Sequence, residues 1–137
     1  MRKITKTLIA IFLIAIMSMT NIIAFASDEG PSPRLSHMSG GSFTFIATSD
    51  GGYVDVTYHG YDSFVRADLT VKIEKSFLFF WWTEVTTWSA SSTQIDDVFY
   101  TTLPLDGSGT YRATFTLLIT GNDGTVDTVT DVIESSY

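Results

Sequence analysis

The clearest pattern in the sequence is Val65-Arg66-Ala67-Asp68-Leu69-Thr70-Val71-Lys72-Ile73-Glu74, in which apolar residues alternate with charged or polar ones. Successive side chains of a β-strand point to opposite faces, so the stretch predicts a strand with one apolar and one charged face. Such a strand is half-buried in an antiparallel sheet. Residues 110–120 repeat the pattern, with these apolar side chains on one side: Tyr111, Ala113, Phe115, Leu117 and Ile119.

Shorter stretches of the same character surround these two and are separated by glycine, asparagine and aspartate. The predicted strands span residues 43–48, 53–59, 65–74, 83–90, 95–103, 110–120 and 126–133. Gly121-Asn122-Asp123-Gly124 predicts a hairpin turn, because these residue types tolerate positive φ angles. Seven short strands predict an all-β fold, a single antiparallel β-sandwich. The chain has no cysteine, so this sandwich has no disulfide.

The first 26 residues predict a secretory signal peptide. Three basic residues precede ten apolar residues in a row, 8–17, and Ala24-Phe25-Ala26 has the small-x-small pattern of a cleavage site. Cleavage is expected between Ala26 and Ser27. The apolar run is shorter than the roughly 20 residues that cross a bilayer. We therefore predict a secreted, extracellular protein, and the absence of cysteine is typical of a bacterial exoprotein.

The remaining chain divides into an arm and a domain. Residues 27–42 combine proline, glycine, serine and charge without periodicity, which predicts a flexible N-terminal arm. The sandwich domain then takes residues 43–137. Without the leader the chain keeps five of its eight basic residues and all fifteen acidic ones, a formal net charge of −10. Such a surface repels phosphate backbones, so nucleic-acid binding is not expected, and electrostatic attraction to anionic lipid is disfavoured.

One short motif resembles a feature of immunoglobulin-like domains. Asp106-Gly107-Ser108-Gly109-Thr110-Tyr111 is similar to the approach to strand F, where a tyrosine hydroxyl bonds back to the upstream backbone. The motif departs from the pattern at Asp106, one residue further from the tyrosine than usual, and at Ala113, where antibody domains place a cysteine. The resemblance implies an Ig-like sandwich and a structural role for Tyr111, and no activity.

The chain as a whole resembles short secreted β-sandwich proteins of Gram-positive bacteria that form families of unknown function. The shared features are a leader, a glycine-broken strand pair, a lysine-rich hairpin arm and a Trp-x-x-Val-x-x-Trp stretch, here Trp82, Val85 and Trp88. This resemblance implies no mechanism.

The strongest functional candidate is Phe77-Leu78-Phe79-Phe80-Trp81-Trp82, placed where a hairpin should turn. In a two-faced sheet about half of these side chains should be exposed. Contiguous exposed apolar surface marks partner or membrane sites, and tryptophan favours interfaces. The alternative is a central strand buried on both faces. Trp88, six positions beyond Trp82, is expected on the same strand face. The predicted interaction residues are Phe79, Phe80, Trp81, Trp82 and Trp88.

The sequence offers little for catalysis or metal binding. The only histidines are His37, in the predicted arm, and His59, at a strand end, and these cannot form a usual zinc site without cysteine. Asp62 and Ser63 follow His59, but no nucleophile-elbow pattern surrounds them. Acidic residues near turns do not have the spacing of a calcium-binding EF-hand: Asp96, Asp97, Asp123, Asp127 and Asp131. We predict no enzyme, no metal and no cofactor.

These observations predict a secreted, non-enzymatic binding protein, monomeric or weakly self-associating, that uses an exposed aromatic hairpin. Its partner would be a protein, glycan or lipid surface. Two other functions remain open: a membrane-active or antimicrobial exoprotein that inserts the same hairpin into lipid, and a structural component of a surface or biofilm layer.

Overall fold

The computed structural model describes residues 35–137, which form seven β-strands. They are β1 (Met38–Thr48), β2 (Gly51–Gly60), β3 (Phe64–Phe77), β4 (Trp81–Ser92), β5 (Asp96–Leu103), β6 (Thr110–Gly121) and β7 (Val126–Ser136). Among these residues no helix is long and apolar enough to cross a membrane. The predicted signal peptide, its cleavage site at Ala26–Ser27 and residues 27–34 of the predicted arm lie outside the described residues.

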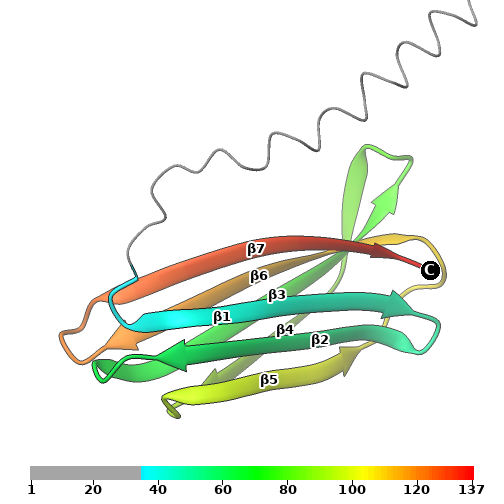
Figure 1. The fold of residues 1–137 in the computed structure, drawn as a ribbon. Coiled ribbons are helices and arrows are strands. Elements are labelled where there is room, and N and C mark those ends of the chain that lie inside the picture. Colours follow the sequence, from blue (N-terminus) through cyan, green and yellow to red (C-terminus); the bar gives the residue numbers. More distant parts are fainter. Residues whose placement is uncertain (1–34) are drawn as a thin grey trace, which may run out of the picture. The chain divides into compact units, whose positions relative to one another are not determined.

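The strands form two antiparallel sheets that pack face to face (Figure 1). One sheet has the strand order β1-β2-β5, and the other has the order β4-β3-β6-β7. Hairpins connect β1 to β2, β3 to β4 and β6 to β7, whereas the other connections cross from one sheet to the other. The predicted all-β sandwich of seven strands is confirmed.

The core lies between the sheets and follows from the alternation in the sequence. The inner face of β3 carries Ala67, Leu69, Val71 and Ile73, all of which are buried. Register places the inner face of β6 beside it, so that Leu69 pairs with Leu117. The opposite sheet completes the core with further buried side chains: Phe45, Val54, Val56, Tyr58, Phe99 and Leu103. Burial of two facing apolar surfaces is the main stabilising contribution to such a fold.

The first strand begins five residues before its predicted start. Met38 already pairs with Gly60, and a bulge between Met38 and Gly40 separates this pair from the regular ladder. Residues 38–42 therefore belong to the sheet and not to a flexible arm. Gly41 permits close packing there, because a β-carbon would lie 2.5 Å from the carbonyl oxygen of Thr57.

Tyr111 sits at the start of β6 as the tyrosine-corner resemblance implies. Its ring is completely buried, and its hydroxyl donates a hydrogen bond to the Gly107 carbonyl at 2.5 Å. Burial raises the pKa of this hydroxyl, so it stays protonated as a donor. The ring stacks on Tyr137, with centroids 6.1 Å apart and planes 8° from parallel. These contacts join the loop before β6 to the C-terminal end of β7.

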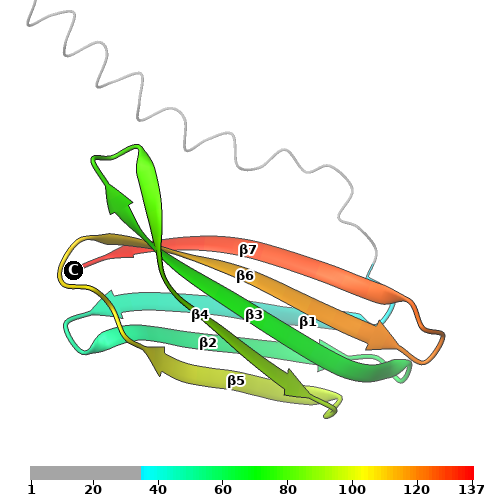
Figure 2. The same cartoon turned by 180° about the vertical axis from the view of Figure 1, so that it is seen from behind.

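Past the start of β6, the β3–β4 hairpin continues alone. Lys75 pairs with Tyr111 and is the last β3 residue that has a β6 partner. The two strands go on pairing with each other as far as Phe77 and Trp81. This end of the hairpin bends away from both sheets and projects beyond them (Figures 1 and 2).

Candidate functional site

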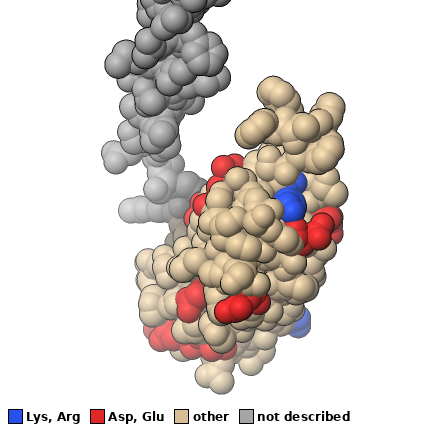
Figure 3. All heavy atoms as spheres, turned by 90° about the vertical axis from the view of Figure 1, so that its right-hand side faces the viewer, with Lys and Arg blue, Asp and Glu red and all other residues tan. Residues whose placement is uncertain are grey.

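The projecting end of the hairpin carries five exposed apolar residues, Phe77 to Trp81, here called the aromatic tip. Phe79 is 94% exposed and Phe80 is 82% exposed, and the other three residues are more than half exposed. In Figure 3 the projection is free of charge, and acidic and basic side chains appear only below it. The arrangement is the exposed alternative of the two that the sequence left open, and a strand buried on both faces is not observed.

The turn at the end of the tip has an unusual backbone. Leu78 and Phe79 have φ angles of 50° and 65°, in the left-handed region. Two consecutive positive φ angles occur in type I′ hairpin turns, where asparagine and glycine are preferred. Bulky side chains are disfavoured in this region because the β-carbon approaches the following carbonyl oxygen. Neither burial nor local conformational preference therefore explains why these positions hold Leu and Phe.

A β-bulge interrupts β4 below the tip. Ile73 pairs with Thr86, but the next residue of β3, Glu74, pairs with Glu84. Val85 is thus an extra residue in β4, and the strand alternation changes phase there.

Because of this bulge, the prediction that Trp82 and Trp88 share a strand face is wrong. Trp88 pairs with Val71 on the inner face and packs against the core. Trp82 pairs with Ser76 on the outer face. The structure therefore brings Trp82, and not Trp88, to the base of the aromatic tip.

A charged network supports Trp82 from the outer face of the sheet. The guanidinium carbon of Arg112 lies 4.2 Å from the centroid of the Trp82 ring, a cation–π contact. Arg112 also donates two hydrogen bonds to one carboxylate oxygen of Glu74, from Nε at 3.0 Å and from Nη2 at 2.8 Å. Lys72 Nζ lies 3.4 Å from the other carboxylate oxygen. The network fixes the orientation of the hairpin base with respect to β6.

This network should make stability depend on pH. Burial raises the pKa of Glu74, but the hydrogen bonds and charge of Arg112, together with Lys72, outweigh burial and leave the pKa below its ordinary value of 4.5. A carboxyl whose pKa is lower in the folded protein stabilises the fold above the unfolded pKa, and this contribution is lost as pH falls through the folded value.

We therefore expect Glu74→Gln to lose less stability than the wild type between neutral pH and about pH 3, as measured by urea unfolding. Arg112→Ala should destabilise the protein at neutral pH by about 1–3 kcal/mol, because it leaves a nearly buried carboxylate without its main partner. Equal acid sensitivity of Glu74→Gln and the wild type would contradict this role. Asp68, Asp97 and Asp123, whose pKa values are also lowered by hydrogen bonds, would then account for the loss.

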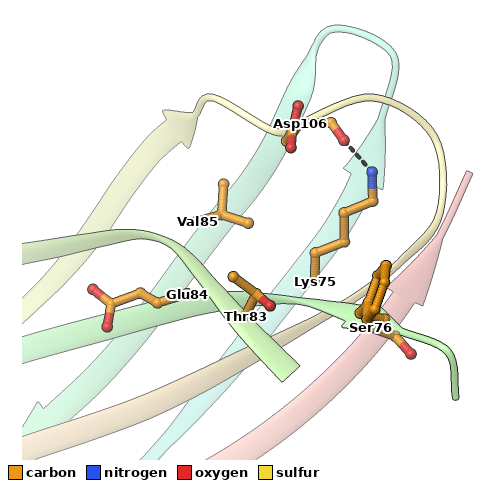
Figure 4. Close-up of a pocket in the computed structure, with 7 residues that line it drawn as sticks. Lys75, Ser76, Thr83, Glu84, Val85 and Asp106 are labelled. Carbon is orange, nitrogen blue, oxygen red and sulfur yellow. Dashed lines mark hydrogen bonds between the residues drawn. The ribbon is translucent and has the colours of Figure 1, made fainter. Parts of the chain in front are cut away.

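A groove of about 480 Å³ lies at the inner side of the hairpin base (Figure 4). It is lined by Lys75, Ser76, Phe77, Thr83, Glu84, Val85 and Asp106. The Lys75 ammonium donates a hydrogen bond to the Asp106 carbonyl, and it also lies 5.6 Å from the centroid of the Tyr111 ring. These contacts tie the hairpin to the loop between β5 and β6. The lining mixes one cation, two carboxylates and two apolar side chains, which does not define a class of ligand.

His37 occupies a buried position that its sequence neighbourhood does not indicate. The residue is 3% exposed, and its ring nitrogens lie 2.8 Å from Ser63 Oγ and 2.7 Å from Thr125 Oγ1. Asp123 Oδ1 lies 3.3 Å from Nε2, so a serine, a histidine and an aspartate are close together. Thr125 shares that nitrogen, and the ring packs so tightly on Gly121 that a β-carbon there would overlap it. His37 thus holds the start of β1 against the β2–β3 turn and the β6–β7 turn.

The other polar candidates have local structural partners. His59 lies 3.3 Å from Asp96, with more than half of each side chain exposed, whereas the Ser63 hydroxyl bonds to the His37 ring. The carboxylate of Asp97 accepts hydrogen bonds from Ser92 and from the Val98 amide. Among residues 35–137, no three histidine, aspartate or glutamate side chains form a group that could hold a metal ion.

No protein-family model, curated protein or solved structure matches the chain.

Proposed function

We propose that the protein is a secreted binding protein whose aromatic tip docks on an apolar target surface. One observation carries this proposal: Leu78 and Phe79 hold left-handed backbone conformations while their side chains remain exposed. Side chains that neither favour the turn nor fill the core are available for another role, and backbone strain of this kind is typical of functional sites. Binding of an apolar surface would bury Leu78 and Phe79, whose side chains do not contribute to the core.

The scaffold suits this role and supports an Ig-like assignment. In Ig domains strands A, B and E are neighbours in one sheet, and C, F and G are neighbours in the other. Here β1, β2 and β5 are neighbours, as are β3, β6 and β7, and β4 extends the second sheet beyond β3. The buried tyrosine corner at Tyr111 agrees with this assignment. A rigid sandwich that presents a hairpin is a common way to position a binding loop.

Export is part of the proposal and rests on residues 1–26. A basic start, an apolar run and Ala24-Phe25-Ala26 support a leader that is cleaved after Ala26. A chain without cysteine is also suited to export by a bacterium that does not rely on disulfides.

The proposal is tested by retention of the protein on phenyl-agarose. We expect the wild type to be retained. The retention factor of Phe79→Ser/Phe80→Ser in the same salt should be at least tenfold lower, because two highly exposed aromatic rings are removed. Stability should stay within about 0.5 kcal/mol of the wild type, since neither ring is buried.

The matched control removes two exposed apolar side chains that lie in the other sheet from the hairpin. Ile46 and Val98 are each 51% exposed on the outer face of the β1-β2-β5 sheet. Ile46→Ser/Val98→Ser should be retained like the wild type. Equal loss of retention in both double variants would show that general surface hydrophobicity, and not the tip, is responsible, and would refute the proposal.

A further inference from the structure

We propose that the target of the aromatic tip is the headgroup–acyl boundary of a zwitterionic lipid bilayer, into which Leu78, Phe79 and Phe80 insert. This inference rests on the proposed function and names its target surface.

The shape of the tip favours a fluid target. Phe77 and Trp81 are cross-strand partners on one face of the hairpin, whereas Trp82 lies on the other face. Leu78, Phe79 and Phe80 form the end of the hairpin. The projecting hairpin therefore carries apolar side chains on both faces and at its end. Specific protein partners bury such anchors in preformed, closely complementary pockets. A bilayer interface receives a convex apolar projection without a preformed shape.

The order of residue types along the hairpin matches the layers of a bilayer surface. The eight residues from Ser76 to Thr83 carry no charge, and the most exposed apolar side chains lie at the end. The half-buried ring of Trp82 comes next, at a level suited to the headgroup region that tryptophan prefers. Lys75 and Arg112 follow at the base, where Arg112 is paired with Glu74 and Lys75 lies beside Glu84 and Asp106. The base thus carries charges of both signs, as zwitterionic headgroups do.

The backbone of the hairpin limits how deeply the tip can insert. Beyond Lys75 the strands β3 and β4 pair only with each other, so the outer edge of each strand lacks a β-sheet partner. Unpaired backbone groups are strongly disfavoured in hydrocarbon but find hydrogen-bond partners among headgroups and water. The tip therefore suits the interface, and the protein would rest on the bilayer with its sandwich in water.

Charge decides which lipid is preferred. Residues 35–137 contain thirteen acidic and four basic residues, a formal net charge of −9. An anionic bilayer would repel this domain over about one Debye length, roughly 10 Å at 0.1 M salt. A zwitterionic surface has no such repulsion, so apolar contact of the tip can determine binding.

The test is sedimentation of the protein with phosphatidylcholine vesicles. We expect the wild type to co-sediment, with its tryptophan emission shifted to the blue, and Phe79→Ser/Phe80→Ser to partition at least tenfold more weakly. Ile46→Ser/Val98→Ser should partition like the wild type. Replacement of half the lipid by phosphatidylglycerol should weaken binding at low salt, and added salt should restore it, since salt screens the repulsion.

Three outcomes would overturn this inference, and each is separable from failure of the proposed function. Vesicle binding that is equal for the tip variant and the control would show that the tip does not insert. Tip-dependent retention on phenyl-agarose without vesicle binding would leave the proposed function standing and point to a protein target. Tip-dependent growth of light scattering without lipid, with no vesicle binding, would identify a second copy of the chain as the partner.

Discussion

Tyr111→Ala is expected to lower the free energy of unfolding by about 3–5 kcal/mol, the range found when a large buried aromatic side chain is truncated. The ring has no exposed surface, and it contacts three separate segments of the fold. Its hydroxyl bonds to Gly107, its face stacks on Tyr137, and the Lys75 ammonium lies over it. Truncation would leave a cavity where the β5–β6 loop, the end of β7 and the base of the hairpin meet.

Tyr111→Phe separates the hydroxyl from the ring. It keeps the packing and removes one hydrogen bond, so we expect a loss of about 0.5–1.5 kcal/mol. Both variants are measured by urea unfolding, with Trp81→Ala as a control that should stay within about 0.5 kcal/mol of the wild type because this side chain is exposed. A large loss for Trp81→Ala and a small one for Tyr111→Ala would contradict the division into a buried corner and an exposed tip.

The strands were predictable because their signal is local. Alternation at residues 65–74 and 110–120 specifies two strands whose inner faces the structure buries, except at Val65, which lies in a register irregularity and is 47% exposed. Tyr111 belongs to a motif that its immediate neighbours define. Exposure of about half of the aromatic run could be expected from sequence, because side chains of one strand cannot all face the core. A strand buried on both faces remained an alternative that only the structure decides. Its projection could not, since this depends on where β6 begins relative to the β3–β4 hairpin.

Features that depend on distant partners were missed. The bulge at Val85 leaves no mark in the mixed valine and threonine sequence around it, yet one extra residue places Trp82 and Trp88 on opposite faces. His37 resembles a linker residue beside serine and glycine, but its partners Ser63 and Thr125 are 26 and 88 positions away. Only the folded chain brings these hydroxyl groups to the imidazole ring.

Leu78→Asn/Phe79→Gly is expected to raise the free energy of unfolding by about 1–3 kcal/mol, although asparagine and glycine are disfavoured within regular strands. The left-handed conformation costs a side-chain-bearing residue roughly 1–2 kcal/mol, and glycine avoids that cost. The observed φ angles of 50° and 65° are those that Asn-Gly adopts in tight hairpins. The same change removes a large part of the exposed apolar tip, so partition onto phosphatidylcholine vesicles should fall at least tenfold.

The control Leu78→Ala/Phe79→Ala separates these two effects. Alanine removes the apolar side chains but keeps both β-carbons in the left-handed region, so vesicle partition should fall as in the Asn-Gly variant without a comparable gain in stability. A stability gain confined to Asn-Gly would mean that Leu78 and Phe79 cost the protein stability in this turn, so that their side chains do not serve folding. If Asn-Gly instead destabilised the protein, Leu78 and Phe79 would be holding the hairpin together, and the case for a binding surface at the tip would lose the observation on which it rests.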